Sequence, residues 1–177
     1  CSSDLLAGGQ SLIPVMNFRL AQPGMLIDLN TTAGLDGLAL TADGSLEIGA
    51  MVRQSTLEKS DLIREHAPLL FETIPWIAHS QIRNRGTIGG SLVHADPAAE
   101  LPVLMVALQA EFELQKVDHT RRVSAEAFYI DLFETELEDD EILTQIILPP
   151  MPQRTGVAFD EVARRHGDYA MADRKSV

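Results

Sequence analysis

The sequence predicts an α+β fold, in which a small parallel βαβ unit precedes an antiparallel sheet with flanking helices. Two apolar runs with a helical pattern between them lie within residues 5–29, which favours a parallel unit. Asp43 and Gly44 stand between two short alternating runs, which is typical of a hairpin. Strand-like runs return after residue 110, so the rest of the sheet is expected there.

The N-terminal unit is read from three adjacent segments. Residues 5–7 form an apolar run that ends at a glycine pair, as a buried strand does when it meets a tight turn. Residues 11–20 have a helical period, with Pro14 tolerated only in the first turn. Residues 25–29 form the second apolar strand. The N-terminus of this helix would then be a suitable place for a bound anion, because the helix dipole favours negative charge there.

The remaining elements follow from periodicity and from proline. The strands at residues 38–40 and 46–48 form the hairpin, and residues 60–78 are helical with interruptions at Pro68 and Pro75. Asp96 is expected to cap a helix that begins at the following proline and runs to about residue 108. Further strands are expected at residues 112–115, 122–124, 142–148 and 156–163. Residues 173–177 are polar, and we expect no regular structure there.

Composition restricts the partners of the chain. Its 177 residues are 45% hydrophobic, which is ordinary for a globular protein, and the formal net charge is −12. So acidic a chain repels nucleic acid and anionic membrane surfaces. An anionic cofactor would therefore be held mainly by backbone N–H groups and hydroxyls, with Arg83 or Arg85 as helpers. Alternatively, this pair, expected to be exposed, would serve as a docking feature for a partner.

Cysteine content argues against an internal disulfide or an iron–sulfur cluster, and hydropathy argues against a membrane span. The single cysteine, Cys1, cannot form an internal disulfide or supply the four thiolates of a typical iron–sulfur cluster. A reducing, cytoplasmic setting is compatible with that count. No apolar run approaches the roughly 20 residues of a membrane span, and no signal peptide is evident.

Several polar and aromatic residues favour structural roles over chemistry. The histidines lack metal-ligand spacing, so no metal site is expected. His94 is expected to pack near the glycine pair at residues 89–90. The acidic residues of segment 134–141 are expected to be a solvated surface. Trp76 and Tyr129 are expected to be core or rim aromatics. No nucleophile–base pair is present, so no catalytic residue is assigned.

Two glycine loops carry the binding chemistry. We define the first glycine loop as residues 7–11 and the second as residues 87–91; each joins a glycine pair to serine or threonine. Glycine permits a positive φ and leaves no Cβ in the way, and successive N–H groups in such a turn form an anion-binding concavity. The two loops predict a site for one dinucleotide held between them.

Segments 5–14 and 82–91, in this order and at this separation, resemble the flavin-binding, or medium, subunit of the molybdenum hydroxylases. That family includes carbon monoxide dehydrogenase, xanthine dehydrogenase and hydroxylases of aromatic and N-heterocyclic compounds. The resemblance covers nearly the whole chain, from about residue 4 to residue 172. It implies the FAD-binding fold of the p-cresol methylhydroxylase type.

The resemblance also implies which residues contact FAD. Both glycine loops would hold the pyrophosphate, Glu100 would lie near a cofactor hydroxyl, Ile77 and Leu143 would be apolar contacts, and Tyr169 would lie near the flavin ring. The full implied set is Ala7, Gly8, Gly9, Gln10, Ser11, Leu12, Ile77, Thr87, Ile88, Gly89, Gly90, Ser91, Glu100, Leu143 and Tyr169.

This sequence departs from the family pattern at three acidic positions. Asp4 stands where members often have lysine, Asp131 replaces a glycine, and Asp160 stands where some members have a basic residue. Asp4 and Asp160 are expected to bring negative charge toward a dianionic cofactor and to weaken its binding.

The resemblance divides the chain into three segments. Residues 1–28 would be the N-terminal part of the FAD-binding domain, a truncated βαβ unit, and residues 29–153 a second FAD-binding subdomain with the antiparallel sheet and helices. Residues 154–177 would start a C-terminal domain that is mostly absent. The ends are expected to be cut, because the family has about thirty more residues in front and a further domain behind.

The function that the resemblance implies is electron transfer within a hetero-oligomer. Electrons would pass from iron–sulfur clusters through FAD to an external acceptor, and the molybdenum cofactor and the clusters would lie only on a large and a small partner subunit. Two alternatives stay open: a self-sufficient FAD oxidoreductase that uses a nicotinamide, and a non-enzymatic scaffold with a decayed flavin site.

Overall fold

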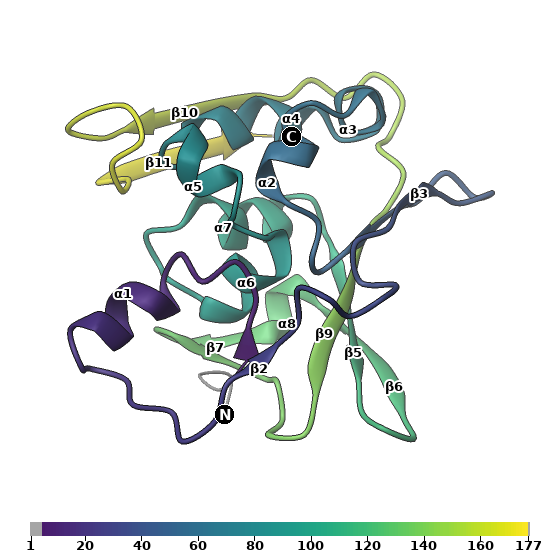
Figure 1. The fold of residues 1–177 in the computed structure, drawn as a ribbon. Coiled ribbons are helices and arrows are strands. Elements are labelled where there is room, and N and C mark those ends of the chain that lie inside the picture. Colours follow the sequence, from purple (N-terminus) through teal and green to yellow (C-terminus); the bar gives the residue numbers. More distant parts are fainter. Residues whose placement is uncertain (1–4, 177) are drawn as a thin grey trace.

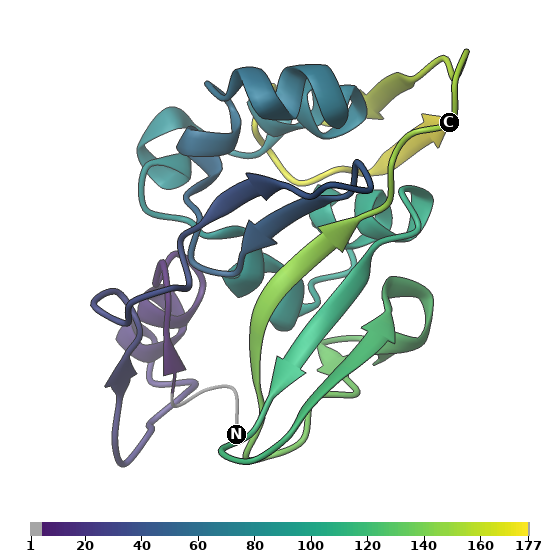
Figure 2. The same ribbon diagram turned by 90° about the vertical axis from the view of Figure 1, so that its right-hand side faces the viewer.

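The N-terminal segment folds as the predicted βαβ unit in the computed structural model, which describes residues 5–176. Strands β1 (Leu5–Leu6) and β2 (Ile27–Asp28) pair in parallel, and helix α1 (Leu12–Asn17) connects them. The helix is shorter than predicted because Arg19 has a φ of +58°, a left-handed conformation that no helix continues through. The unit stands to one side of the molecule (Figures 1 and 2).

A five-stranded antiparallel sheet forms the centre of the protein (Figure 2). Its strand order is β3-β4-β9-β5-β6, so the predicted β3–β4 hairpin and the β5–β6 hairpin flank the long strand β9. The hairpin turn lies where the sequence predicted it, and Gly44 in that turn has a φ of +87°. The strands are β3 (Leu38–Leu40), β4 (Leu46–Gly49), β5 (Glu111–Gln115), β6 (Thr120–Ser124) and β9 (Ile142–Leu148).

Short helices cover one face of this sheet and bury the core. Proline interrupts the region between residues 60 and 78 at the two predicted places, which gives three separate helical turns. The core is fully buried at Phe112 and Phe128, whose rings meet edge to face with centroids 4.9 Å apart. The helical elements are α2 (Gln54–Leu57), α3 (Asp61–His66), α4 (Pro68–Thr73), η2 (Ile74–Trp76), α5 (Ser80–Arg83), α6 (Ile88–His94), α7 (Glu100–Ala107) and α8 (Ala125–Phe128).

Helix α7 begins later than the sequence predicted. Asp96 does not cap it, because its Oδ1 accepts a hydrogen bond from the Ala98 backbone N–H at 2.9 Å and closes a turn before the helix. The N-cap is Ala99, and Glu100 is the first helical residue. Because α7 starts at this later position, Glu100 lies in its first turn, where the helix dipole favours a carboxylate.

The C-terminal residues are not an unstructured tail. Strand β11 (Ala172–Ser176) pairs antiparallel with β10 (Ala158–Val162), and this hairpin packs against α4 and α7 at the top of Figure 1. The expectation of no regular structure at residues 173–177 is wrong for residues 173–176; Val177 lies outside the described residues. Strand pairing satisfies the free backbone groups of an edge strand whatever the polarity of its side chains, which composition alone does not reveal.

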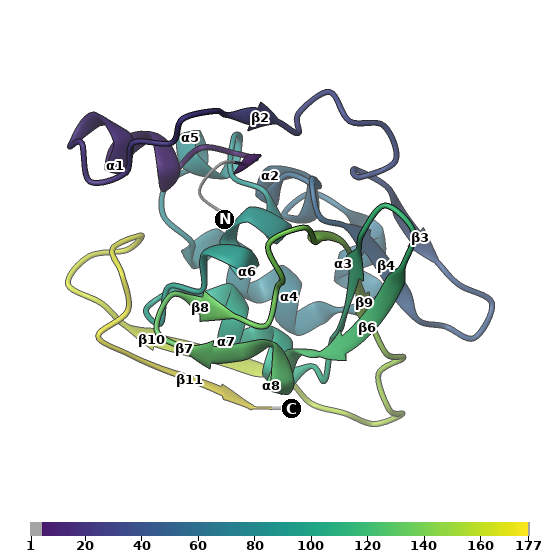
Figure 3. The same ribbon diagram turned by 90° about the horizontal axis from the view of Figure 1, so that it is seen from below.

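A second small hairpin, β7 (Tyr129–Asp131) with β8 (Glu134–Thr135), follows α8. Seen from below, it lies on the side of the molecule away from the strand β2 (Figure 3). The βαβ unit lies beside residues 84–86, which follow α5, so the two glycine loops are neighbours in space.

Candidate functional site

A cavity of about 890 Å³ opens between the βαβ unit, helices α6 and α7, strand β9 and the connection between β10 and β11. Its volume is within the range of roughly 300–1,000 Å³ that is usual for ligand sites. Fourteen of the fifteen expected cofactor-contacting residues line it: Ala7, Gly8, Gly9, Gln10, Ser11, Leu12, Ile77, Thr87, Gly89, Gly90, Ser91, Glu100, Leu143 and Tyr169. The exception is Ile88, whose side chain is fully buried in the core.

The first glycine loop presents open hydrogen-bond donors. Gly9 has a φ of +71°, which only glycine adopts without strain. Within residues 5–176, no acceptor is hydrogen-bonded to the backbone N–H groups of Gly8, Gly9 or Gln10. Ser11 occupies the N-cap of α1, yet its hydroxyl makes no capping hydrogen bond. Adjacent free donors at the start of a helix suit an anion.

The second glycine loop uses its donors inside the fold, which differs from the expectation that both loops offer them to a ligand. The N–H of Ile88 donates to the Val52 carbonyl at 3.0 Å, and that of Gly89 to the Ala50 carbonyl at 2.9 Å. The N–H of Gly90 donates to the Thr87 Oγ1 at 3.1 Å, which is the N-cap bond of α6.

Glycine serves close packing in this second loop. A Cβ on Gly89 would lie 2.6 Å from the Ala50 Cβ and 2.7 Å from its carbonyl oxygen, closer than real Cβ contacts. A Cβ on Gly90 would lie 2.7 Å from Thr87 Oγ1 and 3.3 Å from the Ala7 Cβ, where the two loops face each other. The second loop therefore offers the cavity close backbone approach and the Ser91 hydroxyl.

Arg53 joins the two loops, and no sequence signal singled it out. Its guanidinium donates to the carbonyl oxygen of Arg85 and to the side-chain oxygen of Asn30. The amide nitrogen of Asn30 in turn donates to the Ala7 carbonyl at 2.9 Å. A Cβ on Gly8 would lie 2.4 Å from the Arg85 carbonyl oxygen, so only glycine permits this approach.

Arg83 is a structural clamp and not part of an exposed basic pair. It is 8% exposed, and its guanidinium makes two hydrogen bonds of 3.0 Å to the carboxylate of Glu58. It also donates to the carbonyls of Ile77 at 3.0 Å and Ala78 at 3.1 Å, both cavity-lining residues. The expectation of an exposed Arg83 is therefore wrong, while Arg85 is exposed as expected.

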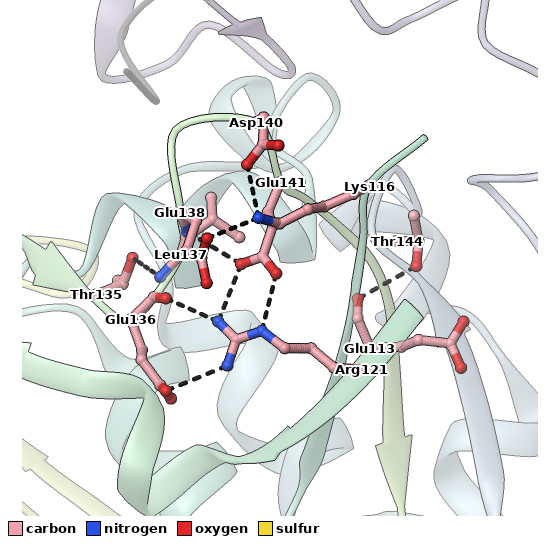
Figure 4. A network of polar contacts seen from close by, with 10 residues as sticks. All are labelled: Glu113, Lys116, Arg121, Thr135, Glu136, Leu137, Glu138, Asp140, Glu141 and Thr144. Atoms are coloured by element: carbon pink, nitrogen blue, oxygen red, sulfur yellow. Dashed lines mark hydrogen bonds and ion pairs between the residues drawn. The ribbon is translucent and has the colours of Figure 1, made fainter. Parts of the chain in front are cut away.

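The acidic segment 134–141 is not simply a solvated surface, as Figure 4 shows. The buried carboxylate of Glu141 accepts hydrogen bonds of 2.8 and 2.9 Å from Arg121, which also contacts Glu136 at 3.1 Å. Lys116 pairs with Glu138 at 2.6 Å and with Asp140 at 2.9 Å. The hydrogen bonds from Arg121 lower the pKa of Glu141 to about 2.

This polar network supports an apolar wall of the cavity. The segment it holds runs directly into β9 and brings Leu137, Ile142 and Leu143 to the cavity surface. Only Leu143 was expected there. The other two were missed because an acidic run without visible partners gave no reason to place its flanking residues at a site.

Tyr169, the aromatic residue expected near the flavin ring, lies near two acidic residues. Tyr169 is 65% exposed at the cavity rim, and its partial burial together with the negative charges of Asp96 and Glu100 raises the pKa of its phenol. His94 lines the cavity and packs against the ring of Phe133, with centroids 5.3 Å apart, which agrees with the packing role expected for it.

The other aromatic and acidic residues lie off the cavity lining. Trp76 meets the ring of Phe159 edge to face, and the Tyr129 ring is packed in the core, where burial raises the pKa of its phenol. Neither Asp131 nor Asp160 lines the cavity. Asp4 lies outside the described residues.

Among residues 5–171, whose side chains the structure describes, no group of three or more histidine, cysteine, aspartate and glutamate side chains is arranged to hold a metal ion. No helix in the same range is long and apolar enough to cross a membrane.

Comparison with known proteins agrees with this geometry. The family model described as "FAD binding domain in molybdopterin dehydrogenase" matches residues 2–151. The 6-hydroxypseudooxynicotine dehydrogenase complex subunit alpha of Paenarthrobacter nicotinovorans is 43% identical over 98% of this chain and 58% of its own length. The carbon monoxide dehydrogenase medium chain of Hydrogenophaga pseudoflava is 41% identical over 95% of this chain and 58% of its own length. The chain thus spans less than two thirds of these relatives.

Solved structures give the same result for the fold. The carbon monoxide dehydrogenase from Hydrogenophaga pseudoflava that lacks the Mo-pyranopterin moiety matches with a TM-score of 0.93 and 40% identity over 96% of this chain and 58% of that one. Quinoline 2-oxidoreductase from Pseudomonas putida 86 matches with a TM-score of 0.90 and 38% identity over 96% of this chain and 58% of that one. The predicted fold class and the resemblance are confirmed: the chain belongs to the family of FAD-binding domains found in molybdopterin dehydrogenases.

Proposed function

We propose that this chain holds FAD as the electron-transfer group of a molybdenum hydroxylase complex. The observation that carries the proposal is the cavity at which the two glycine loops meet, with the open donors of the first loop on its wall. When bound, the flavin supplies two-electron and one-electron redox chemistry, accepting electrons from iron–sulfur clusters and passing them to an external acceptor.

The first glycine loop is the element that would bind the pyrophosphate. The N–H groups of Gly8, Gly9 and Gln10 and the hydroxyl of Ser11 can donate to its oxygens, because no described residue accepts a hydrogen bond from these N–H groups and the hydroxyl makes no capping bond. Arg164 is the one arginine or lysine among the described residues that line the cavity. Binding of a dianion here would therefore rest on oriented backbone dipoles more than on side-chain charge.

The rest of the lining suits the other parts of the cofactor. Ile77 and Leu143, with Leu137 and Ile142 beside them, offer apolar surface to the flavin or the adenine. Glu100 is 5% exposed at the first turn of α7 and would accept a hydrogen bond from a cofactor hydroxyl. Tyr169, at the rim, would lie near the flavin ring.

We infer that the substrate chemistry takes place on partner subunits. This chain has one cysteine, too few for a typical iron–sulfur cluster, and among the described residues that line the cavity we assign no nucleophile–base pair. A large subunit with the molybdenum cofactor and a small iron–sulfur subunit would complete a hetero-oligomer. Relatives named as medium chains of dehydrogenases support this assembly. A reducing, cytoplasmic compartment would be compatible with the single thiol.

Flavin titration tests the cofactor assignment. Flavin-free chain is titrated with FAD and with FMN while flavin fluorescence is followed, and heat or acid is then used to release the bound flavin. We expect one FAD per chain, bound non-covalently, because neither loop contains a cysteine or histidine that could attach the ring. A chain that binds no FAD would favour a scaffold with a decayed site and would overturn the proposal.

Anaerobic reduction tests the electron-transfer role. The FAD-loaded chain is mixed with candidate substrates and with NAD(P)H, with and without the two partner subunits, while the visible flavin absorbance is recorded. We expect bleaching by substrate only when both partners are present. Rapid bleaching of the isolated chain by a nicotinamide would identify a self-sufficient flavin oxidoreductase instead.

A further inference from the structure

Large apolar side chains are exposed on two sides of the entrance to the cavity. Tyr169 and Met171 are exposed in the connection between β10 and β11, and both line the cavity. Phe133 is exposed in the turn between β7 and β8, and its ring packs against that of His94, another lining residue. Single exposed apolar residues are common on protein surfaces, whereas a group of them beside a cavity is typical of an interaction site.

The segment between α6 and α7 lies between these two sides. On one side, the Phe133 backbone N–H donates to the Ala95 carbonyl at 3.1 Å. On the other, partial burial together with the negative charges of Asp96 and Glu100 raises the pKa of the Tyr169 phenol, so these carboxylates lie near it. The exposed apolar side chains thus share one entrance. We call them the apolar rim and define it as Phe133, Tyr169 and Met171.

The charged groups at the cavity are mostly acidic. Among the described residues that line it, Asp96, Glu100 and Asp168 are negative and Arg164 is positive, so the net formal charge of the lining is −2. The pyrophosphate of a bound FAD would add further negative charge. A cleft lined by charges of one sign repels ions of the same sign. An electron acceptor without charge avoids this repulsion.

The second glycine loop is also unsuited to the pyrophosphate of a second dinucleotide. The N–H groups of Ile88, Gly89 and Gly90 donate to acceptors within the fold, and the open donors of the first loop would be taken by FAD itself. A nicotinamide dinucleotide would therefore bring its phosphates to an acidic entrance without these donors. A quinone has no phosphate, and its flat apolar ring suits the aromatic and thioether side chains of the apolar rim.

We propose that the electron acceptor of this chain is an uncharged quinone, which reaches the cavity along the apolar rim. The inference rests on the proposed FAD binding and electron transfer, and it names the class of acceptor. One quinone takes up two electrons and two protons from the reduced flavin and leaves as the quinol, and the flavin returns to its oxidised form. Hydroxylation on the partner subunits would supply the next electron pair, so the quinone is the one oxidant required.

The first test compares two oxidants that share a ring system and differ in charge. The FAD-loaded chain is reduced photochemically without oxygen and mixed with menadione or with naphthoquinone sulfonate, while the return of the visible flavin absorbance is followed. Reduced riboflavin in solution is the reference, because it has the same ring as FAD and no phosphate. Each rate constant is divided by its reference, which removes the difference in intrinsic reactivity between the two quinones.

We expect the chain to favour menadione over the sulfonate by about tenfold on this scale, because a cleft of like charge lowers association rates. Added salt is expected to reduce the preference, since screening weakens the repulsion between exposed charges. Equal ratios for the two quinones, or a preference that salt does not reduce, would overturn the inference.

The second test removes the aromatic ring that the β7–β8 turn contributes to the apolar rim. Phe133→Asn takes away this ring and keeps a residue type that tolerates the left-handed φ of +58° found there. Val117→Asn is the matched control, because Val117 is exposed between β5 and β6 and does not line the cavity. We expect Phe133→Asn to slow reoxidation by menadione about fivefold, and Val117→Asn to leave it unchanged. A rate that falls equally in both variants, or in neither, would contradict a role for the rim. If Phe133→Asn does not fold, the comparison of the two quinones on the unaltered chain decides.

A nicotinamide dinucleotide is the rival occupant of the entrance. The oxidised, FAD-loaded chain is mixed with NADH, and we expect its flavin to be reduced no faster than free riboflavin. Saturable reduction by NADH above that rate would overturn the quinone inference and leave FAD binding intact. Failure of the unaltered chain to bind FAD would instead count against the proposed function.

Discussion

The two glycine loops have nearly the same sequence pattern and opposite surroundings. None of the described residues before Leu35 is buried, so the first loop sits in a unit without a core of its own. The second loop is built into the protein core, where Ile88 and Leu92 are fully buried and Gly89 packs against Ala50. Among the described residues, the first motif thus leaves its donors open, as the proposed FAD binding requires, while the second packs into the core and brings its backbone close to the cavity.

The difference shows what a glycine pair alone does not specify. At Gly9 the reason for glycine is a positive φ, and at Gly89 it is the absence of room for a Cβ. These reasons predict different results for the same substitution. Replacement in the second loop is expected to affect folding, and replacement in the first is expected to affect the ligand.

The largest effect is expected for Gly89→Val. Its Cβ would meet the backbone carbonyl oxygen of Ala50 at 2.7 Å, so the start of α6 would have to separate from the end of β4. We expect the free energy of unfolding to fall by about 3 kcal/mol or more, as measured by urea denaturation of the flavin-free chain. Gly37→Val is the control, because no atom lies within 4 Å of a Cβ there. Equal stability of the two variants would contradict a packing role for Gly89.

The second effect is the pH dependence of folding stability that arises from the pairing of Glu141 with Arg121. The pKa of Glu141 is about 2 in the folded chain, below its usual value of about 4.3. Its pairing with Arg121 thus stabilises the fold above the unfolded-state pKa, and that contribution is lost as the pH falls from about 4.5 to 2. We expect a loss of about 2 to 3 kcal/mol over this window. In the βαβ unit, Asp28 has its pKa lowered by the Asn30 backbone N–H but is fully exposed, so it is not expected to contribute comparably.

The measurement is the free energy of unfolding by urea at a series of pH values, for the unaltered chain and for Glu141→Gln. The variant lacks the titrating carboxylate, so its stability is expected to fall less steeply over the same window. Parallel slopes for the two proteins would show that other groups account for the acid dependence.

The sequence predicted most of the elements because their signals are local. The hairpin at Gly44, the proline interruptions at Pro68 and Pro75 and strand β9 are each determined by a few adjacent residues, and the structure has them where predicted. Strand β11 was missed because its residues are mostly polar and charged, so they lack the apolar alternation that marks a strand, although β11 pairs with the nearby β10.

Most of the residues expected to contact the cofactor line one cavity, and the errors about charged residues around it share a cause. Arg83 and Glu141 are charged residues, which composition places on the surface. Both are buried because each finds an opposite charge far along the chain, Glu58 for the first and Arg121 for the second.

A smaller effect on stability is expected to distinguish the N-cap hydroxyl of α6, on Thr87, from that of α1, on Ser11. Thr87 caps α6 through its bond to the Gly90 N–H, whereas Ser11 at the N-cap of α1 makes no such bond. Thr87→Val is expected to lower the free energy of unfolding by about 1 kcal/mol, measured by thermal denaturation without flavin. Ser11→Ala is expected to leave that stability unchanged and to weaken FAD binding. An equal loss of stability in both variants would mean that the two hydroxyls have the same structural role.

The smallest effect on folding is expected for Gly9→Val. At a φ of +71° a branched residue is strained by about 1 to 3 kcal/mol, and its Cβ would meet the Ile13 side chain at 3.0 Å. None of the described residues of the βαβ unit is buried, so the loop can relieve this strain by changing its own conformation while the five-stranded sheet stays folded. The melting temperature without flavin is therefore expected to stay within a few degrees of the unaltered value. The relaxed loop would no longer present the N–H groups of Gly8, Gly9 and Gln10 together, and FAD binding is expected to be lost in a fluorescence titration.

Gly24→Val is the control in the same unit, because its backbone is unstrained and no atom lies near a Cβ there. Retention of full FAD affinity by Gly9→Val would remove the first loop from the site, and unfolding of the whole chain would show that the unit belongs to the core after all.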